Sequence, residues 1–277
     1  MTFSAIVRLL TYCRCDSSAV FTLGIRVDRT DFCTIFFGAI LPQRFIFRMT
    51  YYEDCPRFFA DGELRSKNHL QPQPCHQANY AAIVSRRGGP EFMTPAGRVI
   101  NDYVAFYFSP LTAMSFTIHR GNVDLLSPQG CVLGKATMDD RIFFVANAEK
   151  FRNAGHEFWF SNVACNSQAP CPQFSSNLDE MENHIAWDLF DEAPIAGRIN
   201  EIGYTGCTTW QHNRDKPTRY QNRRQKRMAE FLVRDAVPLS MFDCIVTKSD
   251  VIKTAVKRMM RDTDINLPIY SKPGCYY

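Results

Sequence analysis

Short apolar runs separated by turn residues dominate this chain, and this pattern predicts several strands and few long helices. The clearest run, 103–108, reads YVAFYF and is stopped by Pro110. A longer pattern over 249–261 predicts a helix capped by Ser249, with apolar side chains on one side. Further strands are predicted at 45–50, 142–145, 158–160, 228–234, 244–247 and 267–270.

Helix signals are shorter. Asp54 is placed to cap a helix that ends at Gly62, because glycine accepts the left-handed backbone of a helix end. Other helices are predicted at 78–86, at 111–119, and from a cap at Asn177 to residue 189. Residues 45–277 are therefore expected to form one α+β domain. Residues 1–44 show irregular periodicity and are expected to form an N-terminal extension of unassigned role.

Composition narrows the class of protein. The 277 residues are 45% hydrophobic and 22% charged, which excludes a disordered or collagen-like chain, and the 22 phenylalanines suit a sheet-rich core. No apolar run approaches the roughly 18 residues that a membrane-spanning helix needs. The eleven cysteines include no CxxC pair, so no metal site is expected. We expect a soluble cytoplasmic protein in a reducing compartment.

Positive charge is concentrated in residues 210–227. Seven arginines and lysines stand there against Asp215, a local excess of six, while the whole chain carries only +4 and the remainder therefore sums to −2. The same segment holds Trp210 and Tyr220. Basic side chains neutralise phosphates and aromatic rings stack on unpaired bases, so the segment predicts nucleic-acid binding. The alternative is an arginine-rich surface without a ligand.

A single carboxylate stands out directly after this basic segment. Glu230 lies in the apolar run MAEFLV at 228–233. Such a carboxylate can act as a general base or stabilise a developing positive charge. The alternative is a charge on the solvent face of an edge strand, and alternation does not decide between the two because both neighbours are apolar.

Several blocks, in order, resemble the DarT family of DNA ADP-ribosyltransferase toxins. The block FRMTYYED at 47–54 resembles the family's opening strand, and DYVAFYFSP at 102–110 is very similar to its DYVPFYF-P strand. GELRSKN at 62–68 resembles the turn that follows the first helix, and IVSRR at 83–87 resembles the helix with the NAD-binding arginine. Residues 223–233 resemble its arginine-rich AEFLV block. Together the blocks extend over about residues 45 to 250.

Two departures from the family pattern concern the base that is modified. Arg48 stands where many members have a histidine, and LTAM at 111–114 replaces an RSPM pattern. His119, Gly121 and residues 128–135 also differ. The family contains thymine-modifying and guanine-modifying branches, and these departures favour the guanine-modifying branch.

The resemblance implies an ADP-ribosyltransferase fold with a split, mixed β-sheet core flanked by helices. It implies NAD as co-substrate, no metal, and Glu230 as the catalytic residue. Breaking the bond to nicotinamide develops positive charge on the ribose carbon, which a carboxylate stabilises. A guanidinium can hold the pyrophosphate through paired hydrogen bonds. The residues expected to contact NAD are Arg48, Thr50, Tyr51, Arg86, Arg87 and Tyr107.

The resemblance also implies single-stranded DNA as acceptor, because a base inside a duplex does not present its Watson–Crick edge. It implies a toxin that is paired with a macrodomain antitoxin of the DarG type, and no membrane partner. Two alternatives remain open, namely transfer to RNA or protein and a non-catalytic nucleic-acid-binding module. The residues expected to contact DNA are Trp210, Arg214, Arg219, Tyr220, Arg223, Arg224 and Arg227.

Overall fold

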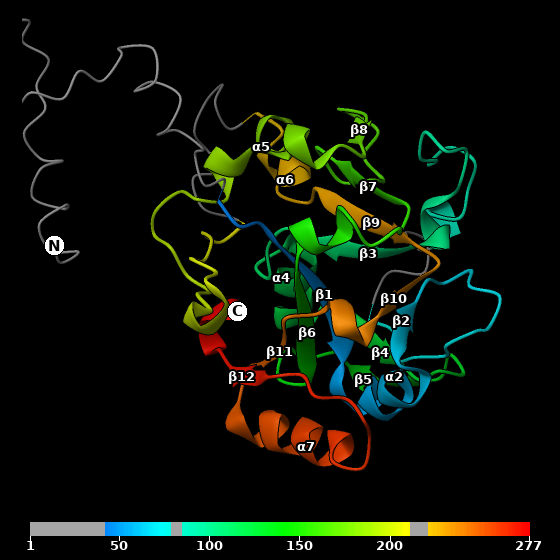
Figure 1. The fold of residues 1–277 in the computed structure, drawn as a ribbon, viewed down its shortest axis with the longest axis vertical. Coiled ribbons are helices and arrows are strands. Elements are labelled where there is room, and N and C mark those ends of the chain that lie inside the picture. Colours follow the sequence, from blue (N-terminus) through cyan, green and yellow to red (C-terminus); the bar gives the residue numbers. More distant parts are fainter. Residues whose placement is uncertain (1–41, 79–84, 211–220) are drawn as a thin grey trace, which may run out of the picture. The chain divides into compact units, whose positions relative to one another are not determined.

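A mixed sheet of eight strands forms the centre of the fold in the described residues 42–78, 85–210 and 221–277 of this computed structural model (Figure 1). All of these residues except Pro42 belong to one unit, Gln43–Tyr277. The strand order is β12-β11-β6-β1-β3-β9-β7-β8. Every neighbouring pair is antiparallel except β11 and β12, which are parallel. The α+β class and the mixed sheet are therefore confirmed.

The strands of the central sheet match the predicted apolar runs within one or two residues, apart from β8, which had no counterpart. Two small sheets, β10 with β2 and β4 with β5, lie outside it. The strands are β1 (Phe45–Tyr51), β2 (Glu63–Arg65), β3 (Tyr103–Tyr107), β4 (Asp124–Leu126), β5 (Val132–Lys135), β6 (Arg141–Asn147), β7 (Phe158–Ser161), β8 (Phe174–Ser175), β9 (Glu230–Arg234), β10 (Ala236–Pro238), β11 (Cys244–Thr247) and β12 (Ile269–Ser271).

The helices are short, apart from α7, which packs beside β11 and β12 (Figure 1). Ser249 caps α7 as predicted, because its side chain accepts a hydrogen bond from the backbone N–H of Ile252. Thr112 and Ser115 form a capping box at the start of α4. The α-helices are α2 (Cys55–Asp61), α4 (Ala113–His119), α5 (Met181–His184), α6 (Arg223–Lys226) and α7 (Asp250–Met260).

Two helix predictions need correction and one lies mostly outside the described residues. Gly62 ends α2 with a φ of 71°, as expected, but the Asp54 side chain makes no capping hydrogen bond. The stretch from Asn177 to residue 189 is not one helix, because it divides into two 3-10 turns around α5. Of the helix predicted at 78–86, residues 79–84 are outside the described part of the chain.

The split of the sheet occurs between β1 and β3. These strands are joined by a single register pair, Phe47 with Tyr107, whereas β1 pairs with β6 along its whole length. Beyond that pair the two strands diverge. Arg48 bridges the divergence, since its Nη1 donates a 3.0 Å hydrogen bond to the carbonyl of Ala105. The open side of this seam positions the site described below.

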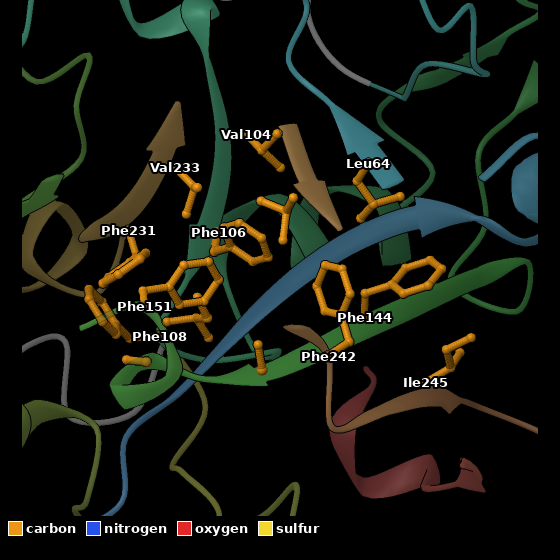
Figure 2. Packing of buried hydrophobic residues seen from close by; sticks show 14 of the residues in the cluster. Leu64, Val104, Phe106, Phe108, Phe144, Phe151, Phe231, Val233, Phe242 and Ile245 are labelled. Carbon is orange, nitrogen blue, oxygen red and sulfur yellow. The ribbon is translucent and has the colours of Figure 1, made fainter. Parts of the chain in front are cut away.

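Apolar side chains hold this frame together on both faces of the sheet. One core cluster joins phenylalanines from β3, β6 and β9, including Phe106, Phe144 and Phe231, which are linked through the rings of Phe151 and Phe242 (Figure 2). The second cluster includes Phe47 and Phe143 from β1 and β6. Burial of a large apolar side chain contributes about 1.5–3 kcal/mol, so these clusters fix the strands that position the polar residues of the seam. Among the described residues, no helix is long and apolar enough to cross a membrane.

Candidate active site

A cavity of about 490 Å³ opens where β1 and β3 diverge. Its walls come from β1, from the loop after β2, from β3 and from the first residue of β9. This volume is within the roughly 300–1,000 Å³ of small-molecule sites in proteins. The cavity therefore has room for most of a dinucleotide, with the remainder outside its mouth.

Glu230 lies at the inner wall of this cavity and is only 1% exposed. Alternation along β9 sends Phe231 and Val233 into the main apolar cluster, so the side chain of Glu230 points to the opposite face of the strand. The solvent-face alternative for Glu230 is thus excluded. Its backbone N–H donates to the hydroxyl of Ser161 at 3.1 Å, which fixes the start of the strand.

Arg87 holds the carboxylate of Glu230 through a two-pronged ion pair. Nη1 donates to Oε1 at 2.9 Å, and Nη2 donates to Oε2 at 2.7 Å. The backbone N–H of Cys165 adds a third donor to Oε1 at 3.1 Å. Burial alone would lower the pKa of Arg87, but the charge and hydrogen bonds of Glu230 outweigh it and raise that pKa. The Arg87 guanidinium is therefore charged in the folded protein.

Two further predicted NAD contacts surround this pair. Burial raises the pKa of Tyr107, and the neighbouring charge of Glu230 raises it further, so the phenol stays protonated. Burial also lowers the pKa of Arg48, as does the positive charge of Arg87. The cavity floor thus combines one carboxylate with two guanidinium groups.

Positive charge dominates the whole lining. Five basic side chains line the cavity against two carboxylates, those of Asp54 and Glu230, so the lining carries an excess of three positive charges if histidine is neutral. A diphosphate-bearing ligand suits this balance because the low local dielectric strengthens each attraction. The five basic residues are Arg48, Arg65, Lys67, Arg87 and Arg141.

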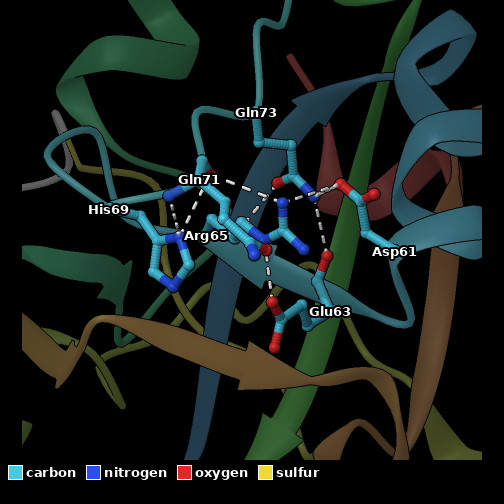
Figure 3. Close-up of polar contacts among 6 residues, drawn as sticks. All are labelled: Asp61, Glu63, Arg65, His69, Gln71 and Gln73. Carbon is cyan, nitrogen blue, oxygen red and sulfur yellow. Dashed lines mark hydrogen bonds and ion pairs between the residues drawn. The ribbon is translucent and has the colours of Figure 1, made fainter.

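The loop after β2 forms one wall and is held by its own polar network (Figure 3). Arg65 donates to Glu63 at 2.7 Å, and Gln73 donates to Asp61 at 2.7 Å. The side-chain oxygen of Gln73 also accepts from the backbone N–H of Arg65. Arg65 is therefore partly neutralised by Glu63 of the same strand and by Asp61 at the end of α2.

Another wall is built on Asp54. Its carboxylate accepts from the backbone N–H of His76 and lies 2.8 Å from His76 Nδ1, which is why it does not cap α2. Burial raises the pKa of Asp54, although the hydrogen bond from His76 opposes this. The His76 ring lies 4.5 Å from the ring of Tyr51. Burial raises the pKa of Tyr51 to about 12. Sequence reasoning treated Asp54 only as a cap and gave His76 little weight.

Most of the residues expected to contact NAD meet in this one cavity. Arg48, Thr50, Tyr51, Arg87 and Tyr107 line it together with Glu230. Arg86 does not line it. That side chain is exposed, and its guanidinium lies 5.2 Å from the ring of Phe92. Of the two adjacent arginines at the end of the IVSRR block, the structure therefore places only Arg87 in the cavity.

Three residues expected to contact DNA are buried in this structure, and their contact with DNA stays a prediction. Arg227 is 1% exposed, and its Nη2 donates to the carbonyls of Thr208 and Leu111 at 2.7 and 3.1 Å. Arg223 is also buried and donates to the carbonyls of Trp210 and Thr209. These guanidinium groups satisfy backbone carbonyls of neighbouring loops, which explains their position in an apolar protein interior.

Trp210 is the third buried residue, at 8% exposure, and it packs edge-on against Phe116. It is not a free platform for a base. Arg224 is exposed, with its guanidinium 5.6 Å from the Trp210 ring, so it remains available for a phosphate. The predicted DNA contacts Arg214, Arg219 and Tyr220 lie outside the described residues.

Sequence reasoning missed three contributors to the cavity. Arg141 begins β6, Ser66 follows β2, and the backbone N–H of Cys165 holds the catalytic candidate. Arg141 had a detectable signal, because it directly precedes an apolar run, much as Glu230 lies within one. Ser66 lies in the GELRSKN block but was not singled out within it, and the role of the Cys165 N–H depends on loop conformation and left no pattern. Within the described part of the chain, no trio of histidine, cysteine or carboxylate side chains is arranged to hold a metal.

Comparisons with known proteins agree on one family. The family model described as "ssDNA thymidine ADP-ribosyltransferase, DarT" matches residues 47–277. A curated relative, the DNA ADP-ribosyl transferase of Thermus sp. (strain 2.9), is 24% identical over 216 residues, which cover 78% of this chain and 87% of the relative.

Solved structures show the same fold. Thermus sp. 2.9 DarT in complex with ADP-ribosylated ssDNA has a TM-score of 0.66 at 21% identity, covering 85% of this chain and 97% of that one. The complex of the same protein with NAD+ has a TM-score of 0.62, covering 86% and 98%. Thermosipho africanus DarTG in complex with ADP-ribose has a TM-score of 0.58 at 15% identity, covering 84% of this chain and 51% of that one.

Proposed function

The chain belongs to the DarT family, and from that membership we propose that it transfers ADP-ribose from NAD to a base of single-stranded DNA. The observation that carries the proposal is Glu230, a buried carboxylate in a positively charged cavity that is large enough for most of NAD.

NAD fits the cavity by charge and by hydrogen-bonding capacity. The excess of positive charge in the lining matches the two negative charges of its pyrophosphate. Two hydroxyl groups of the lining, Thr50 Oγ1 and Ser66 Oγ, are buried and have no partner, so they are available to sugar or phosphate oxygens. Tyr51 and Tyr107 add aromatic surface for the rings of the ligand.

Glu230 is proposed to act on both partners of the transfer. The bond between nicotinamide and ribose breaks, nicotinamide leaves with the bonding electrons, and a base nitrogen forms the new bond to the ribose carbon. The carboxylate favours the positive charge that develops on the sugar. Among the described residues, Oε2 accepts only from Arg87, whereas Oε1 accepts from both Arg87 and Cys165. Oε2 therefore has the spare capacity to take the proton from the base.

Arg87 is proposed to orient Glu230 rather than to serve first as the pyrophosphate ligand. Its paired hydrogen bonds fix the plane of the carboxylate at a buried position. A fixed carboxylate requires no reorganisation when charge develops on the sugar. The adjacent Arg48 keeps further N–H groups beyond the one bound to Ala105.

The acceptor base and the biological role are finer proposals. The departures at Arg48 and 111–114 support guanine, while the description of the matching family names thymidine, so a test must include both bases. We further propose that the protein is the toxin of a pair whose antitoxin carries a macrodomain, and that it acts in the cytoplasm. The boundary between an N-terminal extension and the transferase domain near residue 44 also stays a prediction.

The proposed function is tested by asking which class of acceptor receives ADP-ribose. The protein is incubated with NAD labelled in its adenylate part and with single-stranded DNA, RNA or protein extract. We expect label only on single-stranded DNA, with nicotinamide released in equal amount. Oligonucleotides that lack either guanine or thymine then identify the base by mass spectrometry. Label only on RNA or protein would overturn the DNA proposal, and salt-sensitive DNA binding without nicotinamide release would indicate the non-catalytic module.

A further inference from the structure

Arg141 is a buried arginine whose role neither the sequence nor the proposed chemistry has used. It begins β6 opposite Tyr51 of β1, in the register pair that ends the β1–β6 ladder. Its side chain lines the cavity and is 3% exposed. The guanidinium carbon lies 4.9 Å from the centroid of the Tyr51 ring. The cation is thereby held at a fixed place in the cavity wall.

Most of the hydrogen-bonding capacity of Arg141 is unused within the described part of the chain. There, Nη2 is buried and has no hydrogen-bond partner, and Nε makes only a long 3.4 Å contact with the carbonyl of Thr137. A buried, unsatisfied charged donor is costly, and native proteins retain few of them without a functional reason. Burial accordingly lowers the pKa of Arg141.

The nearest carboxylates do not neutralise it. Asp54 is held by the backbone and ring nitrogens of His76, and Asp140 accepts from the hydroxyl of Thr137. No ion pair joins Arg141 to a carboxylate of the described residues. Arg87 and Arg65 differ in this respect, because Glu230 and Glu63 accept from them. Arg141 is therefore a fixed positive charge that forms no ion pair with a carboxylate of the described residues.

We propose that Arg141 binds a phosphate of the dinucleotide and so contributes to NAD affinity, an inference that rests on the proposed function. A guanidinium binds phosphate through paired, charge-assisted hydrogen bonds, and Nη2 is free to provide one of them. The unpartnered hydroxyls of Thr50 and Ser66 line the same cavity and can complete the phosphate's shell.

The experiment compares ligands with and without phosphate. Binding of NAD to the wild type and to Arg141→Met is measured by calorimetry, with inorganic pyrophosphate and nicotinamide as competitors. We expect NAD and pyrophosphate to bind roughly tenfold or more weakly to the variant, and nicotinamide to change less than about twofold. The KM for NAD should rise while kcat changes little, since Arg141 contacts a part of NAD that does not react.

The folding stability of the variants distinguishes a phosphate-binding role of Arg141 from a structural role. Arg141→Met removes a buried, unsatisfied charge and keeps the apolar volume, so the variant should be at least as stable as the wild type. Arg258→Met on the exposed face of α7 is the matched control, and it should change neither affinity. Arg141→Lys, which keeps the charge but loses the paired geometry, should recover part of the NAD affinity.

Three results would overturn the inference: equal weakening of pyrophosphate and nicotinamide, no weakening of either, or a clear loss of stability in Arg141→Met. These failures are distinct from failure of the proposed function. A wild type that neither binds NAD nor transfers ADP-ribose would overturn both. A wild type that modifies single-stranded DNA while Arg141→Met binds NAD normally would overturn only the role of Arg141.

Discussion

The ion pair between Arg87 and Glu230 predicts a specific pattern of stability in a double-mutant cycle. The two side chains are 14% and 1% exposed and share two hydrogen bonds of 2.9 and 2.7 Å. The perturbation is to replace each side chain by leucine, singly and together. Leucine removes charge and hydrogen bonds while leaving apolar volume in the wall of the cavity.

The structure indicates the size of the effect. Removing one partner of a buried pair leaves the other charge uncompensated, which costs about 3–5 kcal/mol of unfolding free energy. In Arg87→Leu the carboxylate of Glu230 would keep only the N–H of Cys165 as donor in the described residues. Replacing both charges by apolar groups is often nearly neutral, so we expect the double variant to lie within about 1–2 kcal/mol of the wild type.

The assay is urea unfolding of all four proteins, supported by thermal melts. A domain of this size loses about 2–4 °C per kcal/mol, so each single variant should melt roughly 6–20 °C below the wild type. The double variant should melt above both singles. If the two losses instead add within about 0.5 kcal/mol, the side chains are not coupled and the assigned geometry is wrong.

The remaining predictions concern other parts of the chain. Gly62→Ala should lower the unfolding free energy by about 1 kcal/mol in denaturant titrations, because alanine is strained at a φ of 71° although no atom blocks its side chain. Arg224→Ala should weaken single-stranded DNA binding and reduce the slope of log affinity against log salt concentration by about 1. Arg227→Ala should mainly destabilise the fold, which thermal melts would show as a lower melting temperature. Burial raises the pKa of Asp54, so its ionisation removes stability as pH rises from its unfolded pKa near 3.9 through the raised value. The stability of Asp54→Asn relative to the wild type should therefore increase over that window in pH-dependent unfolding, and a constant difference would contradict the assignment.

The sequence predicted the central strands well because each is a compact apolar run bounded by turn residues. The run at 103–108 became β3, and the cap at Ser249 became the start of α7. The seam between β1 and β3 had no sequence signal, since it depends on two strands pairing at one position only. The divergence of the two strands at this seam brings residues from separate motifs together around one cavity.

The candidate site was predictable only in part. Glu230 was identified because it is a charged residue inside an apolar strand. The face of the strand on which its side chain lies was not predictable, because both sequence neighbours are apolar. The environments of the arginines in the basic segment were not predictable, because positive charge in sequence does not distinguish an exposed arginine from one that binds buried carbonyls. Arg224 and Arg227 are three residues apart and have opposite environments.

The most direct test of the account is the rate of ADP-ribose transfer by Glu230→Gln. The variant keeps the shape of the side chain and an acceptor for Arg87, but it loses the charge. Transfer to single-stranded DNA is measured with saturating NAD, next to the wild type and to Glu91→Gln, an exposed control outside the cavity. We predict a fall of about 10²–10⁴-fold for Glu230→Gln and none for the control. Transfer by a folded Glu230→Gln at the wild-type rate would contradict the central claim.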